Sequence, residues 1–525
     1  MKKIFVSVMI LAAALPAIAQ ETYENAKLAA EDLNGTARYV GMGGAMDALG
    51  ADISTIGSNP AGIGMFRRSN VSFSFGAITQ GDAADFAGSK KTRMSFDQVG
   101  LVFACPSGEH SYVNFGFNYH KSRNFGFLLS AADRLYNASQ NKLTFAKAKN
   151  GLLYDGTDKY GVPNVDAPFA SCNQLDDMYT LNRLFDTDDN VWYYDNASDY
   201  TMNRNHKGYI GEYDFNLSGN ANDRFYWGIT IGIHGVHYQH YGEYEENLYD
   251  IDEGVNYAKA RVSDDRSITG HGFDLKAGVI IRPIEESAFR FGLSVATPTF
   301  YDLKTENTTS ILFTGDDSSV GINTEKLEFK LYTPWKFGLS LGHTIGQNLA
   351  LGAGFEYADY GALDTRYGTG SYYDWYTDTY REDSESDKEM NRHTEQTLKG
   401  VCTFKAGAEF KPMPELAVRL GYNYVAPMYQ EYGFKDGTLQ CEGSYFSSAT
   451  DYTNWKATNR LTCGVGYQVG DLNFAFAYQY SNQKGEFSPF MNYFDDDLEE
   501  FDNICDPVSV SNKRHQLLFT IGYTF

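Results

Sequence analysis

The chain has 525 residues, a formal net charge of -23 and an aromatic content of 15%, with 39 Tyr and 36 Phe. This negative charge argues against nucleic acid as a partner and against membrane attachment through a basic patch. Many aromatic and Gly residues together with a mean hydropathy of -0.41 are typical of a membrane β-barrel, because half of each strand faces water and aromatic girdles mark both interfaces. A secreted β-sandwich is the alternative.

Residues 1–19 are predicted to be a secretory signal peptide. Lys2 and Lys3 precede an apolar run, and Ala17-Ile18-Ala19 supplies the small residues of a cleavage site. The mature protein is therefore expected to begin near Gln20. No later apolar run reaches the roughly 18 residues that a membrane-spanning helix needs.

The segment from Thr36 to Phe66 differs from everything that follows it. It is rich in Gly and small residues, does not alternate as a strand does, and ends in Asn59-Pro60-Ala61-Gly62. A compact, turn-rich segment ahead of a closed barrel is placed to fold back into the lumen. We therefore predict that residues 20–69 form a hatch inside the lumen, and that residues 70–525 form the barrel.

The barrel prediction rests on repeated alternation of apolar and small or polar residues. In Leu517 to Phe525 the odd positions are large and apolar, whereas the even ones are mostly Thr and Gly. Successive side chains of a strand point to opposite faces, so each strand has one greasy face. The pattern predicts an all-β fold, an antiparallel transmembrane barrel of about fourteen strands that begin near residues 70, 95, 111, 208, 225, 268, 288, 326, 348, 398, 416, 459, 471 and 513.

Short and long connections alternate along the chain, which is the layout of an outer-membrane barrel. Short turns are expected near 105–110, 218–223, 282–287, 343–347, 411–415 and 469–471. Long loops are expected near 80–94, 121–207, 241–267, 301–325, 361–397, 428–458 and 483–512. Residues 124–130 resemble a strand, but counting them would give an odd number of strands, so 121–207 is predicted to be one large extracellular insertion.

A barrel of fourteen strands has a lumen that wall side chains alone cannot fill. Charged residues of both signs are predicted to face inward: Asp274, Lys276, Arg290, Glu356, Lys405, Glu409 and Arg419. They could form ion pairs that hold a plug, or they could line a polar path for a substrate.

The stretch from Gly41-Met42-Gly43-Gly44-Ala45 to Asn59-Pro60-Ala61-Gly62 resembles the hatch of the FadL/TodX/OmpP1 family of outer-membrane hydrophobic-compound transporters. Tyr332–Leu339, Val418–Tyr424 and Lys513–Phe525 also resemble this family. The resemblance implies a fourteen-stranded barrel that passes long-chain fatty acids or aromatic hydrocarbons without an energy-coupling protein. The ligand would be collected outside and released through a gap in the wall into the bilayer.

Two sets of hatch residues are candidates for function. The hatch motif comprises Gly41, Gly43, Gly44, Asn59, Pro60, Ala61 and Gly62. The apolar residues that could contact a ligand are Met42, Met46, Leu49, Ile53, Ile56, Ile63, Met65 and Phe66. Packing against the inner wall is the alternative role for the apolar set.

The expected location is the outer membrane of a Gram-negative cell, as a monomer. The expected partners are a hydrophobic small molecule, outer-membrane lipid and lipopolysaccharide, and the barrel-assembly machinery, which would read Phe525. No catalytic residue, cofactor or metal site is expected, because His234, His237 and His240 alternate between faces of a strand and no nucleophile motif accompanies them. A barrel that docks exported proteins in type IX secretion, and a general diffusion porin, are the rival functions.

Overall fold

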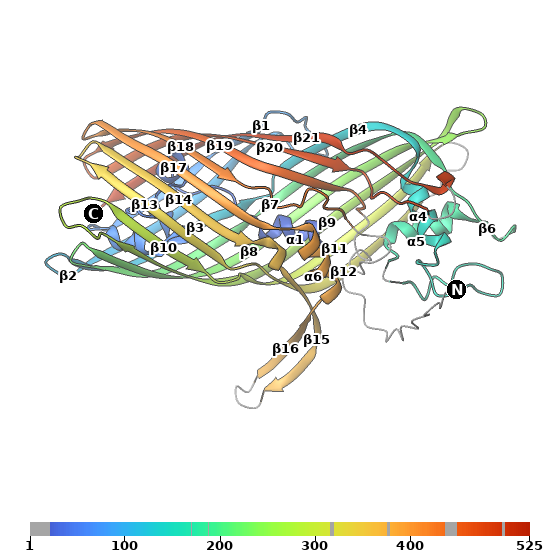
Figure 1. Cartoon of the computed structure of the whole chain (residues 1–525), viewed down its shortest axis with the longest axis horizontal. Coiled ribbons are helices and arrows are strands. Elements are labelled where there is room, and N and C mark those ends of the chain that lie inside the picture. Colours follow the sequence, from blue (N-terminus) through green and yellow to red (C-terminus); the bar gives the residue numbers. More distant parts are fainter. Residues whose placement is uncertain are drawn as a thin grey trace, which may run out of the picture.

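The computed structural model describes residues 21–169, 171–186, 188–314, 320–374, 379–435, 449–495 and 499–525. The predicted signal peptide lies outside these residues. Most of the described chain forms one long barrel, with the C-terminus at one end (Figure 1). Among the described residues, no helix is both long enough and apolar enough to cross a membrane.

The barrel is a closed antiparallel ladder, as predicted. The ladder closes where the first strand, β1, pairs with the last strand, β21, from Asn70 opposite Thr524 to Gln80 opposite Arg514. The fourteen strands of this ladder are β1 (Asn70–Gln80), β2 (Thr92–Gly108), β3 (Ser111–Asn124), β7 (Asn196–Ala221), β8 (Phe225–Asp250), β9 (Val255–Ile281), β10 (Arg290–Ala296), β13 (Lys336–Ile345), β14 (Leu349–Asp359), β17 (Gly400–Met413), β18 (Leu416–Val425), β19 (Tyr452–Val469), β20 (Leu472–Ser488) and β21 (Val508–Thr524).

Other strands continue these fourteen away from the C-terminal end. β4 (Phe127–Ala138) prolongs β3 along β7, and β11 (Phe300–Thr314) prolongs β10 along β9. β12 (Val320–Tyr332) runs into β13. β15 (Asp364–Asp374) and β16 (Thr379–Ser386) form a hairpin that projects from the side of the barrel (Figure 1).

The predictions for three segments of the chain are wrong. Residues 124–130 are predicted to lie in the insertion, but Asn124 ends β3 and residues 127–130 lie in β4. They leave the strand number even because β4 continues the β3 ladder instead of adding a new one. Most of the loops expected at 241–267 and 301–325 is also β-ladder, because β8 reaches Asp250, β9 begins at Val255, and β11 pairs with β12.

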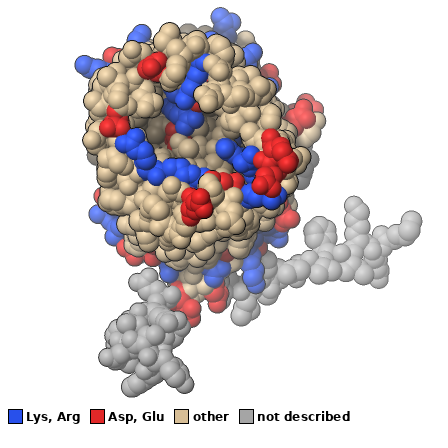
Figure 2. All heavy atoms as spheres, turned by 90° about the vertical axis from the view of Figure 1, so that its left-hand side faces the viewer, with Lys and Arg blue, Asp and Glu red and all other residues tan. Residues whose placement is uncertain are grey.

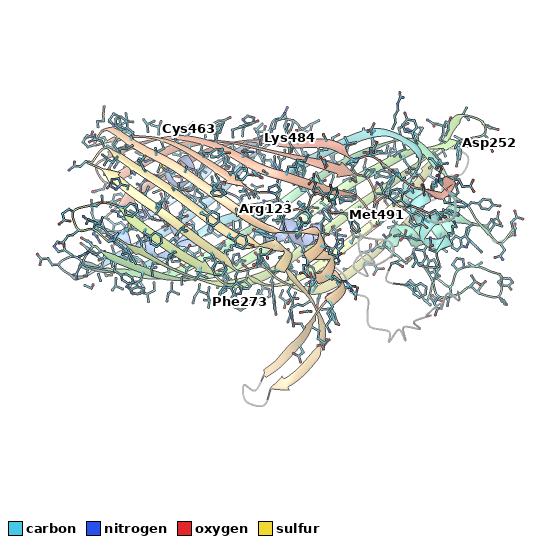
Figure 3. The ribbon with its side chains drawn as sticks, viewed as in Figure 1. Arg123, Asp252, Phe273, Cys463, Lys484 and Met491 are labelled. Carbon is cyan, nitrogen blue, oxygen red and sulfur yellow. The ribbon has the colours of Figure 1, made fainter. Side chains whose placement is uncertain are left out.

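The outward face explains how the barrel is placed in a membrane. Near the short turns of β8, the outward side chains Ile229, Ile231 and Ile233 are each about half exposed. Beyond Gly235 the outward residues become polar, beginning with His237. A membrane strand needs about 9–11 residues, so the apolar band covers less than half of the 26 residues of β8. Phe273 lies on the outside of the barrel in this band (Figure 3).

The connection between β4 and β7 packs into the opposite end of the barrel from the C-terminus (Figure 1). Its elements are α4 (Gln140–Lys149), α5 (Gln174–Tyr179), η2 (Thr180–Leu184), β5 (Phe185–Asp186) and β6 (Val191–Trp192). Leu143 and Tyr179 share a buried apolar cluster with Tyr244 and Phe313 of the wall. The barrel mouth at this end is therefore partly filled by residues 139–169, 171–186 and 188–195. The remaining short elements are η3 (Tyr360–Ala362), α6 (Lys388–Thr397) and η5 (Glu499–Phe501).

Candidate functional site

The N-terminal segment lies in the lumen, as the sequence predicts. Its elements are α1 (Thr22–Ala29), α2 (Ala37–Gly41), α3 (Thr55–Ser58) and η1 (Pro60–Met65). The Thr36 side chain caps α2 by accepting from the Tyr39 amide, and the Asn59 side chain accepts from the Ala61 amide at 3.2 Å. Side-chain caps therefore explain why α2 and η1 begin where they do. We call residues 21–69 the hatch.

Wall charges hold the hatch in place. Arg38 of the hatch donates to both Glu409 oxygens, at 2.9 and 3.0 Å, and Arg419 donates to the same carboxylate at 2.6 Å. Lys405 lies 3.3 Å from Asp47 of the hatch. The inward charged side chains either contact the hatch or form ion pairs with one another. This holds for Arg290, Glu356, Lys405, Glu409 and Arg419. These contacts favour the plug-holding role over a polar path for these residues.

The hatch motif lies against glycines of the wall. Asn59 and Pro60 lie over Gly228 and Gly278, where an added Cβ would overlap Pro60 and the Asn59 oxygen. Gly43 has a φ of +65°, and a Cβ there would lie 2.8 Å from the Tyr422 amide nitrogen. The whole motif is buried: Gly41, Gly43, Gly44, Asn59, Pro60, Ala61 and Gly62. Its glycines therefore allow backbone to approach backbone.

The apolar residues proposed for ligand contact pack into three groups. Met42, Met46 and Leu49 share a cluster with Leu33 and Tyr39. A second cluster joins Ile53, Ile56 and Ile63 to Val102, with Phe66 packed against them. In the third group, Met65 lies against Tyr226 and Ile280. None of these eight named residues lines the large cavity described next. In this position of the hatch, the eight residues stabilise its packing against the barrel wall. A ligand would reach them only after the hatch moves.

A cavity of about 310 Å³ lies between the hatch and the outer part of the barrel. Part of its lining is aromatic: Tyr23 stacks on Tyr429 with ring centroids 5.1 Å apart, and Phe127 lies edge-on to Trp455 at 5.4 Å. The composition of this lining suits a ligand with an apolar body. From the short-turn end the barrel is hollowed at its centre, with charged side chains of both signs around the hollow (Figure 2).

The charged part of the cavity has a local excess of arginine. Several cationic side chains of the lining each pair with a separate carboxylate, as in Arg204–Asp451 and Lys435–Glu21. By contrast, the single carboxylate of Asp32 is shared by Arg123, Arg514 and Arg460, at 3.1, 3.7 and 3.9 Å. Arg123 lies in the middle part of the barrel (Figure 3). Three guanidinium groups facing one carboxylate leave a net positive site inside the lumen.

The barrel wall is broken beside this arginine site. β2 pairs with β3 from Gly108 opposite Ser111 only as far as Gln98 opposite His120. Residues 92–97 of β2 continue along β1, and β3 continues beyond Lys121 along β7. In the described part of the chain, no ladder joins residues 92–97 to residues 121–128. The strand from 111 to 120 carries no Pro or bulge signature that would predict this break.

Hatch residues fill the position of the missing ladder. The Asp32 amide donates to the Ser122 carbonyl at 2.8 Å, and the Asn124 amide donates to Asp32 Oδ2 at 2.9 Å. Asn34 donates to the Lys121 carbonyl at 3.1 Å and to Asp97 at 3.2 Å. Sequence reasoning missed these residues because Asp32 and Asn34 lie ahead of the recognisable motif.

Wall side chains complete the closure. The Gln80 side chain donates to the Leu128 carbonyl and accepts from the Leu128 amide, both at 2.8 Å. Beside the break, Met94 and Phe96 of β2 are exposed on the outer surface, at 79% and 37%. The break therefore leads from a charged and aromatic cavity to an apolar outer surface.

No protein-family model and no curated protein matches this sequence. Similar solved structures include the Ralstonia pickettii toluene transporter TbuX and a Pseudomonas aeruginosa FadL homologue, each with a TM-score of 0.48, 12% identity, and coverage of 94% of this chain and 99% of theirs. The Pseudomonas putida toluene transporter TodX gives a TM-score of 0.47, 10% identity and the same coverage.

Proposed function

We propose that this protein is an outer-membrane transporter that moves hydrophobic compounds with an acidic head, such as long-chain fatty acids, into the bilayer by lateral diffusion. One observation carries the proposal. A cavity with an aromatic wall and an excess of arginine adjoins a break in the barrel wall, and hatch residues 32–34 cover that break.

The two parts of the cavity match the two parts of an amphiphile. Each methylene removed from water against the aromatic wall contributes about 0.8 kcal/mol. A ligand carboxylate can pair with Arg123, Arg460 or Arg514, and charge-assisted hydrogen bonds of this kind are among the strong ones. Asp32 holds this position when no ligand does, so an incoming carboxylate competes with Asp32 for the same guanidinium groups.

The exit of the ligand depends on the same competition between its carboxylate and Asp32. Once Asp32 leaves the arginines, the hatch retains fewer contacts with Ser122 and Asn124. The break then opens toward Met94 and Phe96, where an apolar chain enters lipid without crossing water. No energy-coupling protein is required, because each step exchanges one contact for another.

The location and partners belong to the same proposal. The apolar band suits the outer membrane of a Gram-negative cell, with lipid and lipopolysaccharide around it. The terminal residue Phe525 is half exposed and its amide donates to the Ser69 carbonyl at 2.9 Å. Its ring stacks on Tyr523 with the centroids 6.0 Å apart, and the exposed part of the ring serves as an assembly signal for a barrel that functions as a monomer.

Native mass spectrometry with lipid extraction, on protein purified in mild detergent, tests this function. The wild type is expected to carry fatty acid or a similar acidic lipid, and Arg123→Gln combined with Arg514→Gln is expected to lose most of it. Lys484→Gln removes a cation from an exposed position of β20 and is the matched control. Deleting residues 20–66 should also empty the lumen. An empty wild-type lumen with a co-purifying exported protein would instead support the docking barrel.

A further inference from the structure

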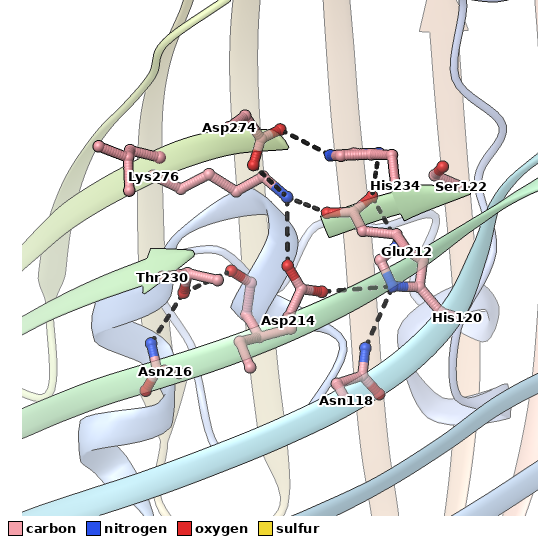
Figure 4. A network of polar contacts seen from close by, with 12 residues as sticks. Asn118, His120, Ser122, Glu212, Asp214, Asn216, Thr230, His234, Asp274 and Lys276 are labelled. Carbon is pink, nitrogen blue, oxygen red and sulfur yellow. Dashed lines mark hydrogen bonds and ion pairs between the residues drawn. The ribbon is translucent and has the colours of Figure 1, made fainter. Parts of the chain in front are cut away.

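A second charged cluster lies in the inner wall beneath α3. Strands β3, β7, β8 and β9 bring together His120, Glu212, Asp214, His234, Asp274 and Lys276 (Figure 4). Glu212, Asp214, His234, Asp274 and Lys276 are buried, and His120 is mostly covered. The proposed transport path uses none of these side chains to hold cargo or to close the wall break.

The cluster is short of positive charge. Lys276 pairs with Glu212 Oε1 and lies 3.3 Å from Asp214 Oδ1 and 3.6 Å from Asp274 Oδ1. Three carboxylates against one ammonium leave two negative charges uncompensated when both imidazoles are neutral. Uncompensated charge is costly away from bulk water. Two protons on the histidines would neutralise the cluster, and so would one divalent cation.

The second oxygen of Glu212 faces both imidazoles. Glu212 Oε2 is 3.5 Å from His120 Nε2 and 3.8 Å from His234 Nδ1. Both separations exceed a hydrogen bond but approach the spacing of about 3.4 Å between neighbouring ligands of a tetrahedral zinc ion. Within the described part of the chain, His234 Nδ1 has no hydrogen-bond partner, although its side chain is only 3% exposed.

Each imidazole is held from behind by a further carboxylate. His234 Nε2 lies 3.0 Å from Asp274 Oδ2. His120 Nδ1 lies 3.4 Å from Asp214 Oδ2 and 3.2 Å from the Asn118 side-chain nitrogen. Histidines that bind metal usually donate their other ring N–H to such a group, which fixes the tautomer and the ring. Thr299 also lies 3.2 Å from Asp274 Oδ2 and orients that carboxylate.

We propose that this cluster binds one divalent transition-metal ion of the zinc class. Glu212 is the shared ligand, because its carboxylate belongs to two sets of three residues, one with His120 and Asp214 and one with His234 and Asp274. In each set the ligand atoms lie within 4.8 Å of one another. Binding draws His120 and His234 toward Glu212 Oε2, while Asp214 and Asp274 orient the rings. Imidazole with carboxylate suits ions of this class.

The cavity supplies a path for the ion and room for a further ligand. His120, Glu212 and Asp274 all line it. Three protein ligands leave a fourth position of a tetrahedral ion for water. This site is independent of the proposed lipid transport, so either proposal can fail without the other.

The experiment uses the full chain in mild detergent, washed with a chelator and dialysed against Zn²⁺ or Co²⁺. Elemental mass spectrometry is expected to give about one ion per chain, and Co²⁺ is expected to give the visible absorption of a four-coordinate site. Glu212→Gln and His234→Gln should abolish both signals, and Asp274→Asn should weaken binding about 10–100-fold.

His240→Gln is the matched control. His240 is a buried inward residue of β8 like His234, but both its nitrogens are occupied, by Tyr238 at 2.9 Å and by Asp264 at 2.7 Å. This variant should retain the ion. Resistance of the folded barrel to SDS checks the fold of every variant. Wild-type protein that binds no more metal than His234→Gln overturns the proposal.

A measurement on the wild type alone covers the case in which variants fail to fold. Metal ligands must be deprotonated, so uptake of Zn²⁺ near pH 6 should release protons, and binding should be lost near pH 5, below the ordinary histidine pKa of about 6.5. Binding that does not change between about pH 5 and pH 8 would contradict histidine ligation.

Discussion

The main-chain amide of Asp32 donates to the carbonyl of Ser122 at 2.8 Å, as a neighbouring strand would at that position. The hatch therefore supplies a hydrogen bond that β2 does not. One residue joins the wall through its backbone and the arginine site through its carboxylate. The state of the arginine site and the state of the wall break are for this reason linked at Asp32.

Asp32→Asn should loosen this closure. The variant keeps the shape of the side chain but removes the charge that Arg123, Arg460 and Arg514 share. Loss of a charged hydrogen-bond partner should weaken the contact by about 1.5–3 kcal/mol, so fatty-acid passage into liposomes containing the protein should be faster.

Asp471→Asn provides the comparison. Asp471 pairs with Arg68 at 2.8 Å, but both side chains are about half exposed, and such surface pairs contribute about 0–1 kcal/mol. Equal passage through the two variants and the wild type would show that Asp32 does not control the break.

Glu409→Gln should detach the hatch from the part of the barrel wall formed by β17. Arg38 and Arg419 both depend on this one carboxylate, and removing one partner of a buried ion pair costs about 3–5 kcal/mol. Limited proteolysis should therefore cut residues 21–69 faster than in the wild type. Glu245→Gln, which breaks an exposed pair with Lys259 and Arg261, should leave the cutting rate unchanged.

Gly278→Ala should displace the hatch without unfolding the barrel. A Cβ at this position overlaps the Asn59 side-chain oxygen, and overpacking of this kind costs about 1–3 kcal/mol. Ion conductance in planar bilayers should rise. Gly235→Ala on β8 is the control, because a Cβ there meets no atom within 4 Å. If the two variants show the same ion conductance, the close packing of Asn59 on Gly278 does not hold the hatch in place.

Docking of residues 139–195 on the outer barrel should depend on pH. Burial raises the pKa of Glu246, on the part of β8 beyond the apolar band, to about 7, although bonds from the Gln140 amide and Tyr244 partly oppose this. A raised pKa means that the contribution to docking is complete below the ordinary glutamate value of about 4.3 and is lost as pH rises through 7.

Proteolysis of the insertion should accordingly be slower at about pH 5.5 than at about pH 8.5. Glu246→Gln should remove most of this difference, whereas Glu253→Gln, at an exposed turn position, should keep it. The same pH profile in all three proteins would assign the effect to other groups.

Alternation predicted the barrel well where one face meets lipid and the other the lumen. In Leu517 to Phe525 that contrast is strong, and the strand count of fourteen followed from such segments. It failed for residues 241–250, because the outward face above the membrane carries polar residues such as Glu243, and the inward face places Glu246 among apolar residues such as Tyr244. Apolar periodicity disappears there although the ladder continues.

The candidate sites were harder to predict because they are made by closure of the barrel. Asp32 and Arg514 are 482 positions apart in number, yet their charged groups lie 3.7 Å apart where β1 meets β21. His120 and Glu212 come from strands joined by the whole insertion. Spacing along the chain carries no signal for such pairs. The alternation of His234, His237 and His240 was predicted correctly: His234 and His240 face inward and His237 faces outward.

The height of the barrel determines how far its lumen extends beyond the membrane. Fifteen residues of β8 separate Gly235, at the rim of the apolar band, from its last residue Asp250. At about 3.3 Å per residue they extend about 50 Å along the strand, or about 35–40 Å above the membrane for a strand tilted by 35–45°. The barrel therefore extends far beyond the apolar band, and under the proposed function a cargo molecule that enters at that end would travel inside protein until it reaches the band.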